Sequence, residues 1–212
     1  IPSSLVEDCL NSAPKQFRMA GREPENDLQI DDSGEVYARN GGGPGHVLNM
    51  ETGKVKEATL NDVKNYAKLV HAFENIHIVA PIYAQDTNNE TRDIETLAAL
   101  FASSSKHINM RLLNRKSLPY VIKMAEIVAG GKEALKDRPL ITMLESPIAP
   151  LKLPDVLIDT LMTCAEHFIP VEICSMPITG ATGPITLSGS LLMSNIEMVA
   201  SIVFAQLVQP GA

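Results

Sequence analysis

The chain has 212 residues, of which 45% are hydrophobic and 20% are charged, and its formal net charge is −7. This composition excludes disordered and collagen-like chains, and its acidic balance provides no electrostatic attraction to nucleic acid or to an anionic membrane. We expect no apolar run to reach the roughly 20 residues of a membrane span, and three cysteines without a CxxC pair favour a reducing, cytoplasmic compartment.

The first 58 residues differ in composition from the rest of the chain. Residues 27–40 predict two short strands around a turn at Asp32-Ser33-Gly34. Residues 40–46 hold four glycines and one proline, which excludes helix and interior strand and lets the backbone approach another segment closely. We therefore expect residues 1–58 to form an N-terminal extension with a hairpin and a glycine-rich loop.

Regular elements are predicted from Thr59 onward, where Thr59 and Asp62 resemble a capping box. Apolar spacing predicts helices that begin near residues 59, 90, 117, 154 and 189, and strands over 76–84, 107–113, 139–146 and 170–176. The expected buried faces are Ile94, Leu97, Ala98 and Phe101 in the second helix, and Tyr120, Met124, Ile127 and Val128 in the third, which Gly130-Gly131 should end.

Apolar strands that alternate with helices indicate an α/β fold with a parallel sheet covered on both faces. Two architectures fit this pattern, an open doubly wound sheet and a (β/α)8 barrel of TIM type. Polar residues follow the predicted strands, and both folds place their sites at the carboxyl ends of strands, so this feature does not separate them. No GxGxxG or GxxxxGK[ST] string signals nucleotide binding.

Two single residues stand out as candidates for the site. Glu145 follows an apolar strand and precedes Ser146-Pro147, where a carboxylate can bind a cationic substrate or act as an acid or base. The alternative is that it caps the next helix or pairs with an arginine. His46 lies in the glycine-rich loop, and the five histidines show no HxH or HExxH spacing, so no metal site is predicted.

The stretch from residue 175 to residue 200 is the most informative part of the sequence. Glycines, prolines and hydroxyl side chains come between a strand and a long helix, where they fix the backbone and permit close approach. We therefore expect Met176, Thr179, Gly180 and Gly183 to line a substrate site, together with Glu145 and His46.

The same stretch, MPITGATGPITLSGSLLMSNIEMVA (176–200), resembles the signature of the trimethylamine:corrinoid methyltransferase family. The strings MLESPIAPL (143–151) and, less specifically, NGGGPG (40–45) are also similar to that family. The resemblance implies a (β/α)8 barrel that demethylates a tertiary or quaternary amine and passes the methyl group to the Co(I) of a separate corrinoid protein. We favour the branch without pyrrolysine, which acts on glycine betaine and related betaines.

The resemblance implies that the chain itself binds no cofactor, because the corrinoid (cobalamin) is carried by the partner. The expected partners are therefore a corrinoid protein and a small methylated amine, with the oligomeric state left open. Residues 59–212 would form the first four or so β/α units, which is about half of the eight that a barrel needs, so we expect a longer enzyme. The alternatives are a barrel lyase or aldolase acting on a small carboxylic acid, and a non-catalytic betaine-binding protein.

Overall fold

The computed structural model describes residues 1–212 as two compact units. We call residues 16–142 the glycine-loop unit, and residues 1–15 together with 143–212 the α7 unit. The chain has a mixed α/β fold, and its largest sheet has four strands in the order β5-β6-β7-β8. The predicted parallel α/β class is confirmed. A closed barrel stays a prediction, as does the division of the chain into 1–58 and 59–212.

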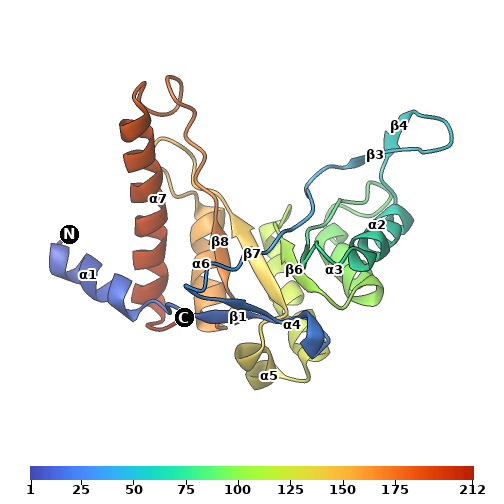
Figure 1. Cartoon of the computed structure of the whole chain (residues 1–212), viewed down its shortest axis with the longest axis horizontal. Coiled ribbons are helices and arrows are strands. Elements are labelled where there is room, and N and C mark those ends of the chain that lie inside the picture. The colour runs from blue at the N-terminus through green and yellow to red at the C-terminus, as the bar shows by residue number, and fades with distance from the viewer. The chain divides into compact units, whose positions relative to one another are not determined.

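The elements follow one another along the chain as drawn in Figure 1. The helices are α1 (Ser3–Ser12), α2 (Leu60–Ala72), α3 (Arg92–Ser103), α4 (Leu118–Ala129), α5 (Lys132–Asp137), α6 (Asp155–Glu166) and α7 (Leu187–Val208). The strands are β1 (Phe17–Met19), β2 (Leu28–Ile30), β3 (His46–Leu48), β4 (Val55–Glu57), β5 (Ile78–Val79), β6 (His107–Met110), β7 (Ile141–Glu145) and β8 (Val171–Ile173). Short 3-10 turns at Pro24–Asn26 and Arg115–Ser117 complete the list.

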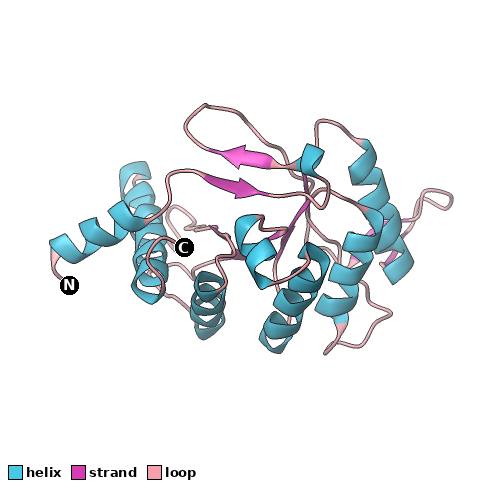
Figure 2. Ribbon diagram, turned by 90° about the horizontal axis from the view of Figure 1, so that it is seen from below, coloured by secondary structure: helices cyan, strands magenta, loops and turns pink.

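In the glycine-loop unit, β5 and β6 pair in parallel with Ile78 opposite His107. The unit also holds two antiparallel pairs, β1 with β2 and β3 with β4, and Figure 2 shows β1 and β2 as arrows that point in opposite directions. The predicted capping box of α2 is confirmed, because the Thr59 side chain accepts from the Asp62 amide while the Asp62 carboxylate accepts from the Thr59 amide.

The hairpin predicted around Asp32-Ser33-Gly34 is wrong. A turn does form there, since the Asp31 carboxylate accepts from the Ser33 amide at 2.9 Å, but the two flanking segments pair elsewhere. β2 pairs with β1 upstream, and Arg39 bridges in parallel to Ile78 of β5. The apolar cluster of Met19, Leu28 and Ile78 accompanies this pairing, because it buries Leu28 of β2 together with Met19 of β1 and Ile78 of β5.

The predicted buried faces of two helices are also partly wrong. In α3 the buried residues include Asp93, Thr96 and Leu100 beside the expected Leu97 and Phe101, whereas Ala98 is exposed. In α4 the buried stripe is Leu118, Val121, Ile122 and Ala125, and Tyr120 and Ile127 are exposed. α4 is apolar around most of its circumference, so spacing alone could not select its buried face. In α3 the buried face includes Asp93 because its carboxylate accepts from the Leu113 and Asn114 amides, a tertiary contact that apolar spacing does not predict. The stop at Gly130 is confirmed by its left-handed φ of 94°.

In the α7 unit, β7 and β8 pair in parallel, with Met143 opposite Val171 and Glu145 opposite Ile173. α7 packs against α6 and against α1, and the Ser12 hydroxyl donates to Gln206 at 3.1 Å (Figure 1). The 22 residues of α7 are long and apolar enough to cross a membrane by length and composition alone, so the expectation that no run reaches that size is wrong. Helices that cover a sheet meet the same criterion.

Candidate functional site

The loop between β8 and α7 folds back on itself and rests on the start of α7. The Ile178 carbonyl accepts from the Gly183 amide at 2.9 Å, and the Ile178 amide donates to the Thr182 hydroxyl at 2.9 Å. The Ser190 hydroxyl of α7 donates to the Pro184 carbonyl at 2.8 Å. These local bonds give the loop a defined shape without burying its side chains.

The predicted site residues of this loop take different positions. Met176 and Thr179 are exposed, and the Thr179 and Ser190 hydroxyl oxygens are 3.1 Å apart. Gly180 has a φ of 80°, a left-handed conformation that favours glycine. A Cβ at Gly183 would lie 3.1 Å from the Pro177 Cβ, so glycine permits close packing there. The loop therefore presents its side chains to solvent while its backbone is fixed, and its role in lining a site stays a prediction.

Glu145 points toward the helix layer. It is 2% exposed, and its Oε1 accepts a hydrogen bond from the Thr160 hydroxyl of α6 at 2.9 Å. Its burial next to the Cys164 thiol contributes, after desolvation, to a raised pKa of that thiol. This geometry favours the alternative of a structural carboxylate, and the substrate-binding role of Glu145 stays a prediction.

Glu172 lies on the opposite face of the β7–β8 pair. Its register partner is Leu144, whereas Val171 and Ile173 face the helices and line a cavity of about 110 Å³ beside α6 and α7. Because successive residues of a strand alternate between faces, the exposed Glu172 carboxylate lies on the face that α6 and α7 leave uncovered.

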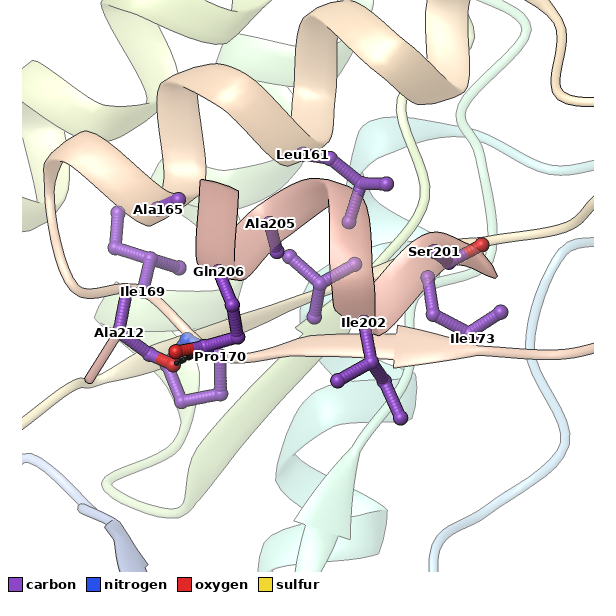
Figure 3. Close-up of a pocket in the computed structure, with 11 residues that line it drawn as sticks. Leu161, Ala165, Ile169, Pro170, Ile173, Ser201, Ile202, Ala205, Gln206 and Ala212 are labelled. Carbon is purple, nitrogen blue, oxygen red and sulfur yellow. Dashed lines mark hydrogen bonds between the residues drawn. The ribbon is translucent and has the colours of Figure 1, made fainter. Parts of the chain in front are cut away.

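The cavity itself belongs to the helix layer. Figure 3 shows Leu161 and Ala165 of α6 above it, α7 beside it and Ile173 of β8 below, with mostly aliphatic side chains directed into it. Gln206 donates to the Ala212 carbonyl at 2.8 Å at one end, near Pro170 where β8 begins. The lining runs along β8 from Pro170, before the strand, to Ile173, its last residue.

Glu197 of α7 is the functional candidate that the sequence analysis did not select. It is 2% exposed, its Oε1 accepts from the Leu151 amide at 2.8 Å, and its Oε2 accepts a short hydrogen bond from the Ser175 hydroxyl. One carboxylate thus binds the loop after β7 and the loop after β8. An acidic residue inside an otherwise apolar helix was the signal in the sequence that could have identified it.

A similar arrangement occurs in the glycine-loop unit. Asp93 of α3 is 1% exposed, and its carboxylate accepts from the amides of Leu113 and Asn114, at 2.9 Å for the latter. The loop after β6 is thereby fixed by a carboxylate of the helix before it. Tyr83 is also buried, donates to the Arg111 carbonyl and has a pKa raised mainly by burial, so its ring is not free to enclose an ammonium group.

The glycine-rich loop lies against the segment that follows β5. The Asn40 side chain donates to the Ala80 carbonyl at 2.7 Å and accepts from the Ala80 amide at 2.8 Å, and Gly43 donates to the Pro81 carbonyl. The expected close approach is confirmed, because a Cβ at Gly42 would lie only 2.7 Å from the Ala80 Cβ. His46, the first residue of β3, is exposed in this unit, and its substrate-binding role stays a prediction.

Together these residues describe a parallel β/α protein whose strand-end loops are fixed by buried side chains. No three His, Cys, Asp or Glu side chains are grouped so that they could hold a metal ion.

Comparison with known proteins defines the family. The family model for trimethylamine methyltransferase (MTTB) matches residues 1–212, and the chain therefore belongs to this family. It is 32% identical over 213 residues to trimethylamine methyltransferase MttB of Desulfitobacterium hafniense (strain DSM 10664 / DCB-2), covering 100% of this chain and 43% of that protein. The resemblance inferred from residues 176–200 is thus confirmed.

Two further relatives carry different names. The chain is 32% identical over 209 residues to glycine betaine methyltransferase of Desulfitobacterium hafniense (strain Y51), covering 98% of this chain and 43% of the relative. It is 29% identical over 217 residues to trimethylamine methyltransferase MttB of Methanosarcina barkeri, covering 100% and 44%. The chain therefore spans less than half the length of these relatives.

Proposed function

We propose that this chain is part of an amine methyltransferase that removes a methyl group from a tertiary or quaternary amine and transfers it to the Co(I) of a corrinoid carried by a separate protein. The observation that carries the proposal is the family match over all 212 residues, among relatives named for trimethylamine and for glycine betaine. The branch that acts on betaines, without pyrrolysine, remains the one we favour.

The reaction makes limited demands on the protein. The methyl carbon leaves nitrogen for the acceptor, and the amine keeps the electron pair of the broken C–N bond. The corrinoid supplies the nucleophile, so the chain has to bind the amine, orient its C–N bond and exclude water. A quaternary ammonium has no hydrogen-bond donor, which leaves carboxylates and aromatic faces as its binding groups.

Two features of the chain support this assignment of roles. The exposed Glu172 carboxylate lies on the helix-free face of the β7–β8 pair, where it can offer a negative charge to an ammonium group. The loop that contains Met176, Thr179, Gly180 and Gly183 follows the same strand and is internally fixed, so it can act as a rigid wall of the site. We include Glu145 and His46 among the site residues to be tested.

We further propose that the parallel sheet is part of a (β/α)8 barrel in the whole protein. The proposal is supported by the parallel order β5-β6-β7-β8 and by the helices that separate the strands. A cytoplasmic location is part of the same proposal, because a reduced cobalt acceptor requires a reducing compartment.

The proposal is tested with the full-length protein, a candidate amine and the reduced corrinoid protein expressed from the same source. Trimethylamine and glycine betaine are offered separately, and the absorbance of Co(I) is followed over time. We expect loss of the Co(I) band together with formation of dimethylamine or dimethylglycine. Absence of both changes with every methylated amine, in the presence of an active corrinoid protein, would contradict the proposal.

A further inference from the structure

Glu197 holds two strand-end loops with one buried side chain. The carboxylate belongs to α7 and is 2% exposed. Its two oxygens diverge, since Oε1 accepts from the Leu151 amide at 2.8 Å and Oε2 accepts from the Ser175 hydroxyl. Leu151 lies in the loop after β7, and Ser175 begins the long loop after β8.

The loop at Leu151 has a geometry that needs such a partner. Residues Ile148 and Lys152 bond to each other through both backbone pairs, at 2.8 and 3.0 Å, and this closes a tight turn. Inside it Leu151 has a φ of 57°, a left-handed conformation that is unfavourable for a leucine. The turn leaves the Leu151 amide without a backbone acceptor, and Glu197 supplies one.

Burial makes this carboxylate a specific anchor. A buried charge is tolerated only when its oxygens receive hydrogen bonds, so Glu197 favours loop conformations that present both donors. The Ser201 hydroxyl, one turn further along α7, donates to the backbone carbonyl of Glu197 at 2.9 Å. This hydrogen bond involves the helix backbone and contacts neither loop. The carboxylate therefore couples the loops to each other, and the helix backbone does not.

We propose that Glu197 is a positioning residue, which sets the loop after β7 against the loop that carries Met176, Thr179, Gly180 and Gly183. The expected effect on turnover rests on the proposed function, whereas the expected effect on loop order rests only on the two hydrogen bonds. Glu197 acts through the Leu151 amide and the Ser175 hydroxyl, and we assign it no contact with the substrate.

The first test measures loop order in the full-length protein by hydrogen–deuterium exchange. Glu197→Ala removes both acceptors, and we expect exchange in peptides covering 148–153 and 174–186 to rise by about tenfold, with α2 unchanged. Glu197→Gln keeps an acceptor for Leu151 and a polar partner for Ser175, so it should restore most of the protection. Ser201→Ala is the matched control on the same helix and should leave both loops as in the wild type.

A narrower variant covers the case in which Glu197→Ala does not fold. Ser175→Ala removes one donor only, and we expect faster exchange in 174–186 with 148–153 unchanged. Unchanged exchange in both loops of the Glu197→Ala protein, or in 174–186 of the Ser175→Ala protein, would overturn the proposal. An equal rise in all peptides, α2 included, would also overturn it, because that result indicates general destabilisation.

The second test connects loop order to turnover. If the proposed methyl transfer occurs, kcat/KM of the Glu197→Ala protein should fall by about tenfold and recover in Glu197→Gln, with Ser201→Ala near the wild type. A kcat/KM that stays at the wild-type value while the loops exchange faster would contradict the positioning role in turnover. If the wild-type protein transfers no methyl group, the proposed function fails while the exchange data still decide whether Glu197 fixes the loops.

Discussion

Glu145 of β7 and Glu172 of β8 show how a shift of one residue along a strand changes the environment of an acidic side chain. Glu145 and Glu172 lie on neighbouring strands, but the register places Glu145 opposite Ile173 and Glu172 opposite Leu144. Glu145 is therefore directed at α6 and buried, whereas Glu172 is exposed on the other face. The register distinguishes the environments of these two acids.

The Glu145–Thr160 bond should matter for stability. Thr160→Val keeps the shape of the side chain but removes the donor to a buried carboxylate, and we expect a loss of about 1–3 kcal/mol in the free energy of unfolding. Thr163→Val is the matched control, because the Thr163 hydroxyl donates to a backbone carbonyl on the exposed side of α6. Denaturant titration measures both. A raised KM for the amine in a Thr160→Val protein of unchanged stability would place Glu145 in the site instead.

Glu172 should matter for substrate affinity. Glu172→Gln removes a negative charge from the helix-free face, and we expect KM for a quaternary amine to rise by about 3- to 10-fold without loss of stability. Steady-state kinetics at several salt concentrations measure the effect, which should shrink as salt is added. Glu166→Gln, at an exposed position of α6, is the control. Equal KM values in the two variants would exclude Glu172 from the site.

His107 is a buried residue whose protonation opposes folding. Its Nδ1 donates to the Ala20 carbonyl at 3.0 Å and its Nε2 accepts from the Thr142 hydroxyl at 2.6 Å, so the ring is neutral in the folded protein. Burial lowers its pKa to about 4 from 6.5. The unfolded chain therefore binds the proton more tightly, and the stability from this group is present above pH 6.5 and lost as the pH falls toward 4.

The expected size of the His107 effect is up to about 3 kcal/mol between the two ends of that pH range. Urea titrations at a series of pH values measure it for the wild type and for His107→Gln, which keeps a donor and an acceptor but does not titrate. The difference in the free energy of unfolding between the wild type and His107→Gln should change between pH 6.5 and pH 4. A difference that stays constant with pH would contradict the prediction that protonation of His107 opposes folding.

At the scale of the element, the glycine-rich loop illustrates what sequence patterns can and cannot predict. Four glycines near residue 40 predicted a close backbone approach, and the structure identifies Ala80 as the residue approached. The pattern could not identify this neighbour, because it lies 40 positions away along the chain. The same limit explains the hairpin error, in which β2 pairs with β1 while Arg39 bridges to β5.

The role of individual glycines in this loop is testable. A Cβ at Gly42 would lie 2.7 Å from the Ala80 Cβ, whereas a Cβ at Gly41 meets no atom within 4 Å. Gly42→Ala should therefore cost about 1–3 kcal/mol of stability, and Gly41→Ala less than about 0.5 kcal/mol. Thermal or denaturant unfolding of the two variants side by side measures the difference. Equal stabilities would mean that the loop does not pack closely on Ala80.

Helix boundaries were predicted better than helix faces. The starts of α2 and α6 followed from Thr59, Asp62 and Pro154, which are local signals that need no tertiary partner. The buried face of α4 depends on which apolar stripe meets the sheet, and the sequence offers two stripes of similar apolarity. The role of Glu197 also depends on tertiary partners, because the Leu151 amide and the Ser175 hydroxyl come from loops 46 and 22 positions away.

At the scale of the whole molecule, the fold class and the family were accessible from the sequence because they depend on repeated patterns. Alternating strands and helices predicted the parallel sheet, and the string at 176–200 indicated the family that the comparison then established. A closed barrel would need eight strands, and the parallel sheet has four, so the barrel stays a proposal that the patterns within residues 1–212 do not test.

Methyl transfer from an amine to a corrinoid protein can be followed directly by isotope labelling. Full-length protein is incubated with the reduced corrinoid protein and with glycine betaine or trimethylamine labelled with deuterium in its methyl groups. Mass spectrometry should then find one labelled methyl group on the corrinoid and an amine product that has lost one. A corrinoid that remains unlabelled while an active partner methyltransferase can label it would contradict the account.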